Sequence, residues 1–478
     1  MKVRFPENMK ASALLVISIA APFVMIFLYV WLTASQVVFR DDIYLIKGGW
    51  VESYCNGTLA FSAFWRPAAS TRIPGYNFLQ FINIKVFGMN SKLIALSIPF
   101  LVLGSVLMIY RDYRKCFAPR RSSGFIALSF LFVSLLMFNI IQWEGLTFSY
   151  AFVFQSPLPF FIASVICFER ILTKGTPGYV AAGLLLSALS VLVFGGTHSY
   201  SFAWALGLTF VCYAGTRRDR MTKEVWLRAL GVSAYLGVLA VLYMYNIRHN
   251  DYFPHATHHV DKMIAQPLAA LQFLLAAFGA SVVGVNAAKM YFPFSGMVFL
   301  GSLVVCLYGL ALFLYFRFRL YERSYLPFYL LMQAFFYLVF MTAGRFGYGI
   351  DYGMASRYTC VSVLGLVGSG WVLIYVLAGG RTRRTGAVNL LVVPLMVIAA
   401  GLILTAMTEW RIQPHRKVYF ENLREIALRV DSASDEELAK FEERPALVRE
   451  SLRVLKECHL NVYHQPSIVR RSGSPGKQ

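Results

Sequence analysis

The sequence predicts an all-α protein that crosses a membrane many times. Of its 478 residues, 58% are hydrophobic and only 14% are charged, and the mean hydropathy is +0.57. Apolar runs as long as a transmembrane helix recur along most of the chain. Counting these runs, and keeping the loops rich in Lys and Arg on one side of the membrane, predicts about eleven transmembrane helices.

The formal net charge of +21 raises the question of a nucleic-acid partner. Lys and Arg gather, however, in short loops between the apolar runs, where the positive-inside rule expects them. We therefore interpret the basic charge as a sign of membrane topology, with some added attraction to anionic lipid headgroups. Membrane lipids are expected among the partners, and nucleic acid is not.

The first ten residues are short and basic, and the apolar run 11–33 that follows is too long for a signal-peptide core and lacks a convincing cleavage site. We therefore expect an uncleaved first span. A long outer segment rich in aromatic residues, 34–92, comes next, and its apolar stretch from Ile73 to Gly88 is interpreted as an interfacial helix. The further spans are expected at 93–110, 125–141, 151–168, 179–194, a run ending at Gly215, 229–247, 295–316, 326–343, 358–377 and 388–407.

One apolar segment, Pro267–Val285, conflicts with this count. If it crossed the membrane, Arg317, Arg319 and Arg323 would lie outside, against the positive-inside rule. We therefore expect it to be interfacial or re-entrant, which is tolerated where protein or a water-lined cavity buries the backbone. The resulting topology places the N-terminus in the cytoplasm and the C-terminus outside.

The composition changes after the last span. Residues 1–408 form the predicted membrane domain, whereas 409–465 are charged and amphipathic and contain a capping box at Ser434–Glu437. We expect these residues to form a small helical appendage on the outer face. A disordered tail, 466–478, is expected to follow it.

The seven cysteines show no CxxC or Cys/His spacing typical of zinc or redox sites. Most of them lie in apolar runs, where cysteine behaves as a small core residue. Cys55 and Cys458 both fall on the outer side and would pair if the fold brought them together. The sequence leaves that pairing open.

Polar residues suited to chemistry collect on the outer side, whereas the inner loops hold little beyond topogenic charge. The adjacent Asp41 and Asp42 follow the first span, where charged carboxylates are costly and therefore indicate a function, such as that of a general base. The alternative is an ordinary polar cap of an outer helix. The outer set comprises Asp41, Asp42, Arg66, Arg72, Glu144, His198, Arg345, Asp351 and Arg357.

Arg345 and Arg357 lie at the mouths of two consecutive spans. The planar guanidinium of arginine suits phosphate oxygens, so both are candidates to hold an anionic leaving group. Alternatively, they reach lipid headgroups or neutralise Asp351. Glu144, between two apolar spans, either belongs to the site or is solvated at the membrane boundary. A carboxylate beside an acceptor hydroxyl, with cations beside a departing phosphate, describes group transfer from a lipid phosphate.

Several short motifs, taken in order, resemble those of bacterial membrane glycosyltransferases of the GT-C superfamily, such as serotype-converting or O-antigen-modifying enzymes. The motifs are Asp41-Asp42, Trp65-Arg66-Pro67, Lys85-Val86-Phe87-Gly88-Met89-Asn90, Gln142-Trp143-Glu144 with Phe154-Gln155, Ala355-Ser356-Arg357-Tyr358 and Leu460-Asn461-Val462-Tyr463. The resemblance covers most of the chain and implies a GT-C-like fold. At Gly145 the chain departs from the pattern, since relatives often have Asn there.

The resemblance implies transfer of a sugar from a polyprenyl-phosphate carrier to a glycan or lipid-linked acceptor, such as O-antigen, on the periplasmic face of the bacterial inner membrane. Asp41 or Asp42 would be the base, and an arginine at the span mouths would contact the phosphate. The candidate substrate-binding residues are Arg66, Glu144, His198, Arg345, Arg357 and Tyr358. A divalent cation stays open, because some superfamily members use one held by acidic residues and others do not.

Two further classes compete with this interpretation. A flippase or transporter of lipid-linked saccharides also needs many spans, but it should place charges at mid-depth in the membrane. Here the charges gather at one face, which favours an enzyme. A glycan polymerase typically has a large outer loop late in the chain, whereas the long loop here is the first one.

Overall fold

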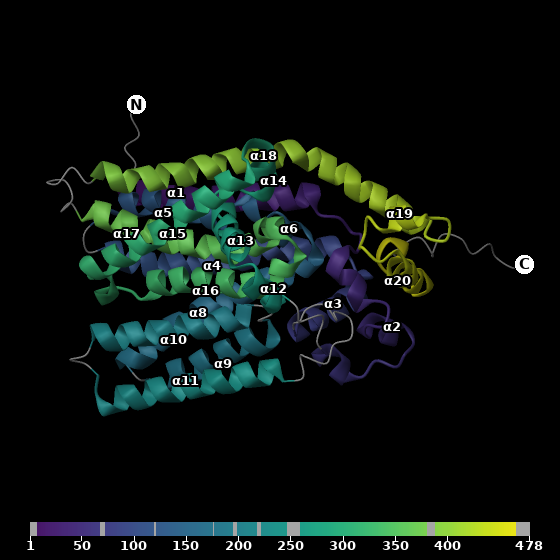
Figure 1. Cartoon of the computed structure of the whole chain (residues 1–478). Helices are drawn as coiled ribbons and strands as arrows, with labels where there is room; N and C mark the ends of the chain where they lie inside the picture. The colour runs from purple at the N-terminus through teal and green to yellow at the C-terminus, as the bar shows by residue number, and fades with distance from the viewer. Residues whose placement is uncertain are drawn as a thin grey trace, which may run out of the picture.

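The structure is a computed structural model of the chain. It describes residues 7–66, 72–118, 121–174, 176–194, 198–217, 221–245, 259–379 and 388–464. The predicted tail 466–478 and Pro67 lie outside these residues. Every regular element within them is a helix, as the sequence predicts. Figure 1 shows long helices packed side by side, with the C-terminal appendage at one end of the bundle.

Nine helices among the described residues are long and apolar enough to cross a membrane, and each coincides with a predicted span. They are α1 (Glu7–Thr33), α4 (Ser91–Phe117), α5 (Ser123–Met137), α8 (Pro157–Lys174), α11 (Lys223–Met244), α15 (Phe294–Arg317), α16 (Leu326–Arg345), α17 (Thr359–Ala378) and α18 (Val388–Leu428). Short helical turns extend four of these spans, at the start of α8 and α17 and at the end of α5 and α16. The chain is therefore a multi-pass membrane protein.

The other two predicted spans, 179–194 and the run ending at Gly215, are also helical but do not belong to this set. α9 (Pro177–Ala188) is short and continues as a π-helical turn, η5 (Leu189–Val193). α10 (His198–Thr216) follows it. In Figure 1, α9, α10 and α11 lie side by side along the bundle. A total of eleven crossings requires both α9 and α10 to span the membrane.

The segment expected to be interfacial or re-entrant, Pro267–Val285, begins at a sharp bend. α12 (His259–Ala265) and α13 (Pro267–Ala280) meet at an angle of 112°, as in a broken span or a re-entrant loop. α13 approaches α15 so closely that a Cβ on Gly301 would lie 1.7 Å from the carbonyl oxygen of Leu275. Only glycine permits this crossing of the two helices.

The apolar stretch interpreted as an interfacial helix is α3 (Pro74–Phe87), which follows α2 (Trp50–Cys55) in the outer segment. Its inward-facing side chains are largely polar and its outward-facing ones are apolar. The buried polar residues are Asn77, Gln80 and Asn83, and the exposed apolar residues are Phe78, Ile82, Val86 and Phe87. This pattern is the reverse of that in a surface helix of a water-soluble protein, and it suits a helix whose outer face meets lipid.

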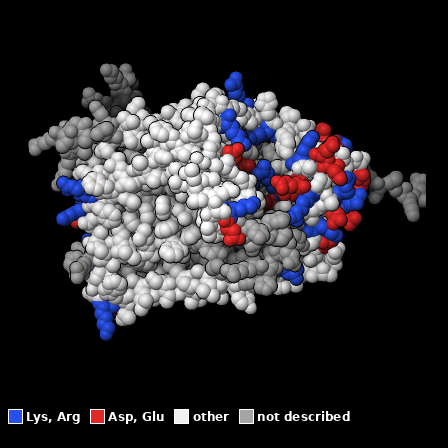
Figure 2. Space-filling model, viewed as in Figure 1, with Lys and Arg blue, Asp and Glu red and all other residues white. Residues whose placement is uncertain are grey.

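The appendage continues from α18, which runs past the predicted boundary at residue 408 without a break. It consists of α19 (Asp435–Leu438), α20 (Pro445–Glu457) and η14 (Asn461–Tyr463). The predicted capping box is present, because the side chains of Ser434 and Glu437 each accept a backbone N–H of the other residue. Figure 2 shows charged side chains gathered at this end, whereas the visible bundle surface is mostly uncharged.

A disulfide joins the appendage to the first outer segment. Cys55 ends α2 and Cys458 follows α20, and their Cα atoms lie 5.9 Å apart although 403 positions separate them in the sequence. The pairing that the sequence leaves open is therefore made in the fold. The other five cysteines are free thiols.

Candidate active site

The adjacent acids Asp41 and Asp42 lie in different environments, although both belong to the short helix η1 (Arg40–Leu45). Asp41 is half-buried and lines a small pocket. The other lining residues are Phe39, Arg40, Glu144, Phe148, Tyr150, Ala151, Phe154 and Arg357. Across the described part of the chain, no group donates a hydrogen bond to the Asp41 carboxylate or forms an ion pair with it. Its oxygens are therefore open to a ligand in the pocket.

Asp42 is buried and hydrogen-bonded on both carboxylate oxygens. The Tyr76 hydroxyl donates to Oδ1 at 2.5 Å, and the Ser149 hydroxyl donates to Oδ2. Gln80 Nε2 donates to the Tyr76 oxygen at 2.6 Å, and Asn83 Nδ2 donates to Gln80 Oε1 at 2.9 Å. The buried polar face of α3 is therefore a chain of hydrogen bonds that ends at Asp42.

Burial raises the pKa of Asp42 to about 6, and the neighbouring Asp41 carboxylate adds to the rise. The hydroxyls of Ser149 and Tyr76 act in the opposite direction, because they stabilise the charged form. Asp42 is thus fixed in place and enclosed, whereas Asp41 lines the pocket. The two acids, which the sequence alone does not distinguish, therefore have different environments in the structure.

Glu144 begins α6 (Glu144–Thr147), and both of its carboxylate oxygens have polar partners. Its Oε1 lies 3.1 Å from Arg40 Nη1 in an ion pair. Its Oε2 accepts the Ser356 hydroxyl at 3.0 Å and the Arg357 backbone N–H at 3.4 Å. Glu144 is therefore buried but not solvated at a boundary, and it fastens η1 to the start of α17.

Arg345 and Arg357 share one group of tyrosines. The Arg357 guanidinium carbon lies 5.2 Å from the Tyr352 ring centre and 5.5 Å from that of Tyr358, which is buried. The Arg345 guanidinium carbon lies 5.8 Å from the Tyr348 ring centre, and the ring centres of Tyr348 and Tyr352 are 5.1 Å apart. Two guanidinium groups held together on aromatic faces form a site suited to an anion.

Four of the candidate substrate-binding residues lie outside the pocket lining, namely Arg345 and Tyr358 beside Arg357, and the more distant Arg66 and His198. Arg66 is exposed and follows η2 (Phe61–Trp65). His198 is fully buried at the start of α10, where it stacks on Tyr337 with ring centres 5.0 Å apart. Its ring centre lies 6.1 Å from that of the pocket residue Phe154. Neither ring nitrogen of His198 has a hydrogen-bond partner among the described residues.

The remaining members of the outer set serve other parts of the structure. Arg72 is buried and donates to the backbone carbonyls of Trp65 at 3.1 Å and Tyr243 at 3.2 Å. It therefore holds the first outer segment against the end of α11. Asp351 is exposed in η11 (Ile350–Met354) and does not line the pocket.

Sequence reasoning missed four residues that hold the predicted acids in place. These residues are Arg40, Tyr76, Ser149 and Ser356. Arg40 directly precedes Asp41, so its position was an available signal. Ser356 lies within the Ala355-Ser356-Arg357-Tyr358 motif, which was also a signal. Tyr76 and Ser149 gave no signal, because Ser and Tyr occur throughout the outer loops and spans.

A buried ion pair next to the site was also missed. Glu409 and Arg416 on α18 lie 2.5 Å apart, and the Arg416 guanidinium lies 3.6 Å from the ring centre of Trp143, the neighbour of Glu144. Asn286 on α14 (Val285–Tyr291) donates to Glu409 at 2.9 Å. The spacing of seven residues places both charges on one face of a helix, and this signal was available in the sequence.

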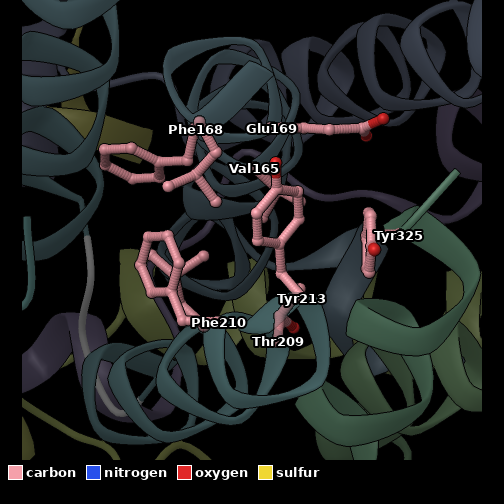
Figure 3. A pocket seen from close by; sticks show the side chains of 9 residues that line it. Val165, Phe168, Glu169, Thr209, Phe210, Tyr213 and Tyr325 are labelled. Atoms are coloured by element: carbon pink, nitrogen blue, oxygen red, sulfur yellow. The ribbon is translucent and has the colours of Figure 1, made fainter. Parts of the chain in front are cut away.

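A second small pocket lies between α8, α10 and the turn before α16. Figure 3 shows its aromatic lining, which includes Phe168, Phe210, Tyr213 and Tyr325, with Glu169 at the edge. Among the described residues that line this pocket, one has a carboxylate and none is basic. It also lies near helix ends that the positive-inside rule assigns to the cytoplasm. Its chemistry therefore differs from that of the Asp41 pocket.

Within the described ranges, no group of three or more His, Cys, Asp or Glu side chains is arranged to hold a metal ion. The Asp41 pocket contains two carboxylates, those of Asp41 and Glu144. Glu144 is already occupied by Arg40 and Ser356. This donor set fits a divalent cation poorly, because such ions take several oxygen ligands.

Comparison with known proteins assigns no family. No protein-family model matches the chain, and no curated protein shows significant sequence similarity to it. The function must therefore be argued from the geometry of the pocket and from the order of its motifs.

Proposed function

We propose that the protein is a glycosyltransferase of the GT-C type. It would move a sugar from a polyprenyl-phosphate donor to an envelope glycan, such as O-antigen, on the periplasmic face of the bacterial inner membrane. The observation that carries this proposal is that the unpaired carboxylate of Asp41 and the guanidinium of Arg357 line the same pocket. A base and a phosphate-binding cation are what group transfer from a lipid phosphate requires.

In this reaction, Asp41 accepts the proton of the acceptor hydroxyl while the hydroxyl oxygen attacks the anomeric carbon of the sugar. The bond between that carbon and the phosphate oxygen breaks, and polyprenyl phosphate leaves with the electron pair. Arg357, with Arg345 on the neighbouring Tyr348, stabilises the charge that develops on the phosphate. Asp42 and Glu144 hold η1 and α17 around the pocket.

The other candidate substrate-binding residues take supporting roles in this proposal. Tyr358 lies beneath Arg357 and keeps the guanidinium at the pocket. His198 backs the pocket residue Phe154. Arg66, which is exposed on the outer segment, would meet the acceptor or a lipid headgroup rather than the transferred sugar.

The proposed topology has eleven crossings, with the N-terminus in the cytoplasm and the C-terminus in the periplasm. Its main support is the Cys55–Cys458 disulfide, because such bonds persist in oxidising compartments such as the periplasm. Both cysteines belong to the segments assigned to the outer face, which is also the face of the Asp41 pocket. The donor sugar would therefore be used after it reaches the periplasmic leaflet.

The test is a sugar-transfer assay on the purified protein, with a panel of polyprenyl-phosphate sugars and lipid-extract acceptors. We expect Asp41→Asn to lower the rate at least about 100-fold, because general base catalysis contributes about that much. Asp42→Asn should retain part of the activity, since its amide oxygen can still accept a hydrogen bond. Asp351→Asn, an exposed acid on the same face, is the matched control and should transfer at the wild-type rate.

Each outcome of this assay decides between functions. Unchanged transfer by Asp41→Asn would remove Asp41 from the mechanism. If the wild-type protein binds the lipid carrier but transfers no sugar from any donor, a flippase is favoured over a transferase. Addition of many repeat units to one acceptor would instead identify a glycan polymerase.

A further inference from the structure

The appendage, residues 435–464, binds the short segment that carries the two adjacent acids. The backbone N–H of Arg40, just before the acids, donates to the Phe441 carbonyl at 3.1 Å. The Ser451 hydroxyl of α20 donates to the carbonyl of Ile43, just after them, at 3.3 Å. The C-terminal region therefore contacts η1 on both sides of the acidic pair.

Asn461 in η14 extends this contact and is fully buried. Its Nδ2 donates to the carbonyl oxygens of Gln36 at 2.6 Å and Met89 at 2.7 Å. Its Oδ1 accepts the backbone N–H of Val38 at 3.3 Å, and its own N–H donates to the Gly88 carbonyl at 2.6 Å. Both amide hydrogens and the amide oxygen of this side chain are therefore used.

The partners of Asn461 belong to the two segments that fix the acids. Gln36 and Val38 lead from α1 into η1, which carries Asp41. Gly88 and Met89 follow α3, whose Tyr76 hydroxyl holds Asp42. One side chain therefore ties the chain before η1 to the end of α3.

The backbone at Asn461 favours this residue type. Its φ angle is +58°, in the left-handed region that Asn adopts more readily than most residues. Cys458, three positions earlier, is bonded to Cys55 at the end of α2. The disulfide thus keeps this part of the appendage against the outer segment by a covalent link.

We propose that Asn461 is a positioning residue for Asp41, and that the Cys55–Cys458 disulfide keeps Asn461 in place. The catalytic part of this inference rests on the proposed transferase function, whereas the structural part does not. Without the Asn461 side chain, the segment before η1 loses two hydrogen bonds and its link to Met89 after α3, and Asp41 shifts within the pocket. A displacement of about 1 Å at a catalytic group can lower a rate about 100-fold.

The sharpest test is Asn461→Gly, because glycine keeps the left-handed backbone without strain and removes only the side chain. We expect kcat to fall at least about tenfold. The KM for the donor should stay within about twofold, because the phosphate-binding Arg345 and Arg357 are untouched. Hydrogen exchange should become faster at the amides of residues 36–43 and stay unchanged in α17, because the lost bonds involve the former segment and not α17.

The matched control is Asp431→Asn, which alters exposed ion pairs to Arg453 and Lys456 in the same C-terminal region. It should match the wild type in kcat and in exchange at residues 36–43. The double variant Cys55→Ser/Cys458→Ser is expected to change both quantities in the same direction as Asn461→Gly. It provides the test if Asn461→Gly does not fold.

The exchange measurement tests the positioning role of Asn461, and the wild-type activity tests the proposed function. Wild-type exchange at residues 36–43 in Asn461→Gly, or faster exchange with an unchanged kcat, would overturn the positioning role. If the wild-type protein transfers no sugar, the proposed function fails instead. The exchange rates then decide by themselves whether Asn461 holds the segment.

Discussion

At the scale of single residues, the roles of Asp41 and Asp42 depend on contacts that are remote in sequence. Asp42 is held by Tyr76, 34 positions away, and by Ser149, 107 positions away. The sequence predicted that the pair was functional, because two carboxylates beside a span are costly. It could not identify the free acid, since that depends on which side of η1 faces α3. The same limit explains why the predicted substrate-binding set includes residues that do not line the pocket, which are Arg66, His198, Arg345 and Tyr358.

The raised pKa of Asp42 predicts how protein stability depends on pH. The unfolded carboxyl loses its proton near its usual pKa of 3.8, whereas the buried one keeps it up to a pKa of about 6. Between these values the folded state binds more protons, so the free energy of unfolding falls as pH rises. By neutral pH, the free energy of unfolding has fallen by about 3 kcal/mol through this group.

Melting temperatures of the wild type and Asp42→Asn, measured from pH 4 to pH 7.5, check this prediction. The wild type should lose stability relative to the variant as pH rises from about 4 to about 6, and the difference should then stay constant. Parallel curves for the two proteins would contradict the raised pKa. Asp351→Asn, which removes an exposed acid outside the pocket, is the matched control variant.

At the scale of elements, hydropathy predicted where helices occur but not which residues their side chains contact. It predicted α3 as an interfacial helix, and the exposed Phe78, Ile82 and Val86 agree with that prediction. It did not predict that the opposite face of α3 supports Asp42, because an apolar average hides three buried amides. Similarly, α18 was predicted as a span ending near residue 407, yet it continues to Leu428 and carries a buried ion pair.

The ion pair of Glu409 and Arg416 should be important for stability. Both side chains are almost inaccessible, with 0% and 10% of their surface exposed. Glu409→Gln leaves the guanidinium of Arg416 buried without its counter-charge, which costs roughly 3–5 kcal/mol. The melting temperature should therefore fall clearly, and replacing both residues with Gln should restore part of the loss.

A second ion pair on the same helix provides the control. Lys417 and Glu421 are 59% and 60% exposed, so Glu421→Gln should change stability by less than about 1 kcal/mol. Equal melting temperatures for Glu409→Gln and Glu421→Gln would show that the buried pair does not stabilise the fold. Because Arg416 also packs on Trp143, Glu409→Gln should disturb the Glu144 loop as well.

At the scale of the whole molecule, the order of the spans was predictable and the contacts between them were not. Length and apolar composition are local properties, and nine of the predicted spans meet both criteria. The site instead depends on pairs such as Arg40 with Glu144, 104 positions apart, and on a disulfide that links positions 403 apart. Each of these contacts exists only once the bundle has assembled. The pocket is therefore a property of the packed helices.

The predicted orientation of the bundle in the membrane can be tested at two exposed glutamates. Glu322 lies after α15, on the side that the Arg-rich loops assign to the cytoplasm, and its side chain is 47% exposed. Glu421 lies near the outer end of α18 and its side chain is 60% exposed. Each is replaced by Cys in a protein whose five free thiols have been removed and whose disulfide is retained.

In intact cells, a membrane-impermeant maleimide should label Glu421→Cys and should label Glu322→Cys only after the inner membrane is permeabilised. This outcome would place the disulfide, the appendage and the Asp41 pocket in the periplasm, because Glu421 belongs to the helix that leads into the appendage. If only Glu322→Cys were labelled in intact cells, the protein would have the opposite orientation in the membrane. The pocket would then face the cytoplasm, where a disulfide is hard to keep oxidised, and the proposal of a periplasmic transferase would fall.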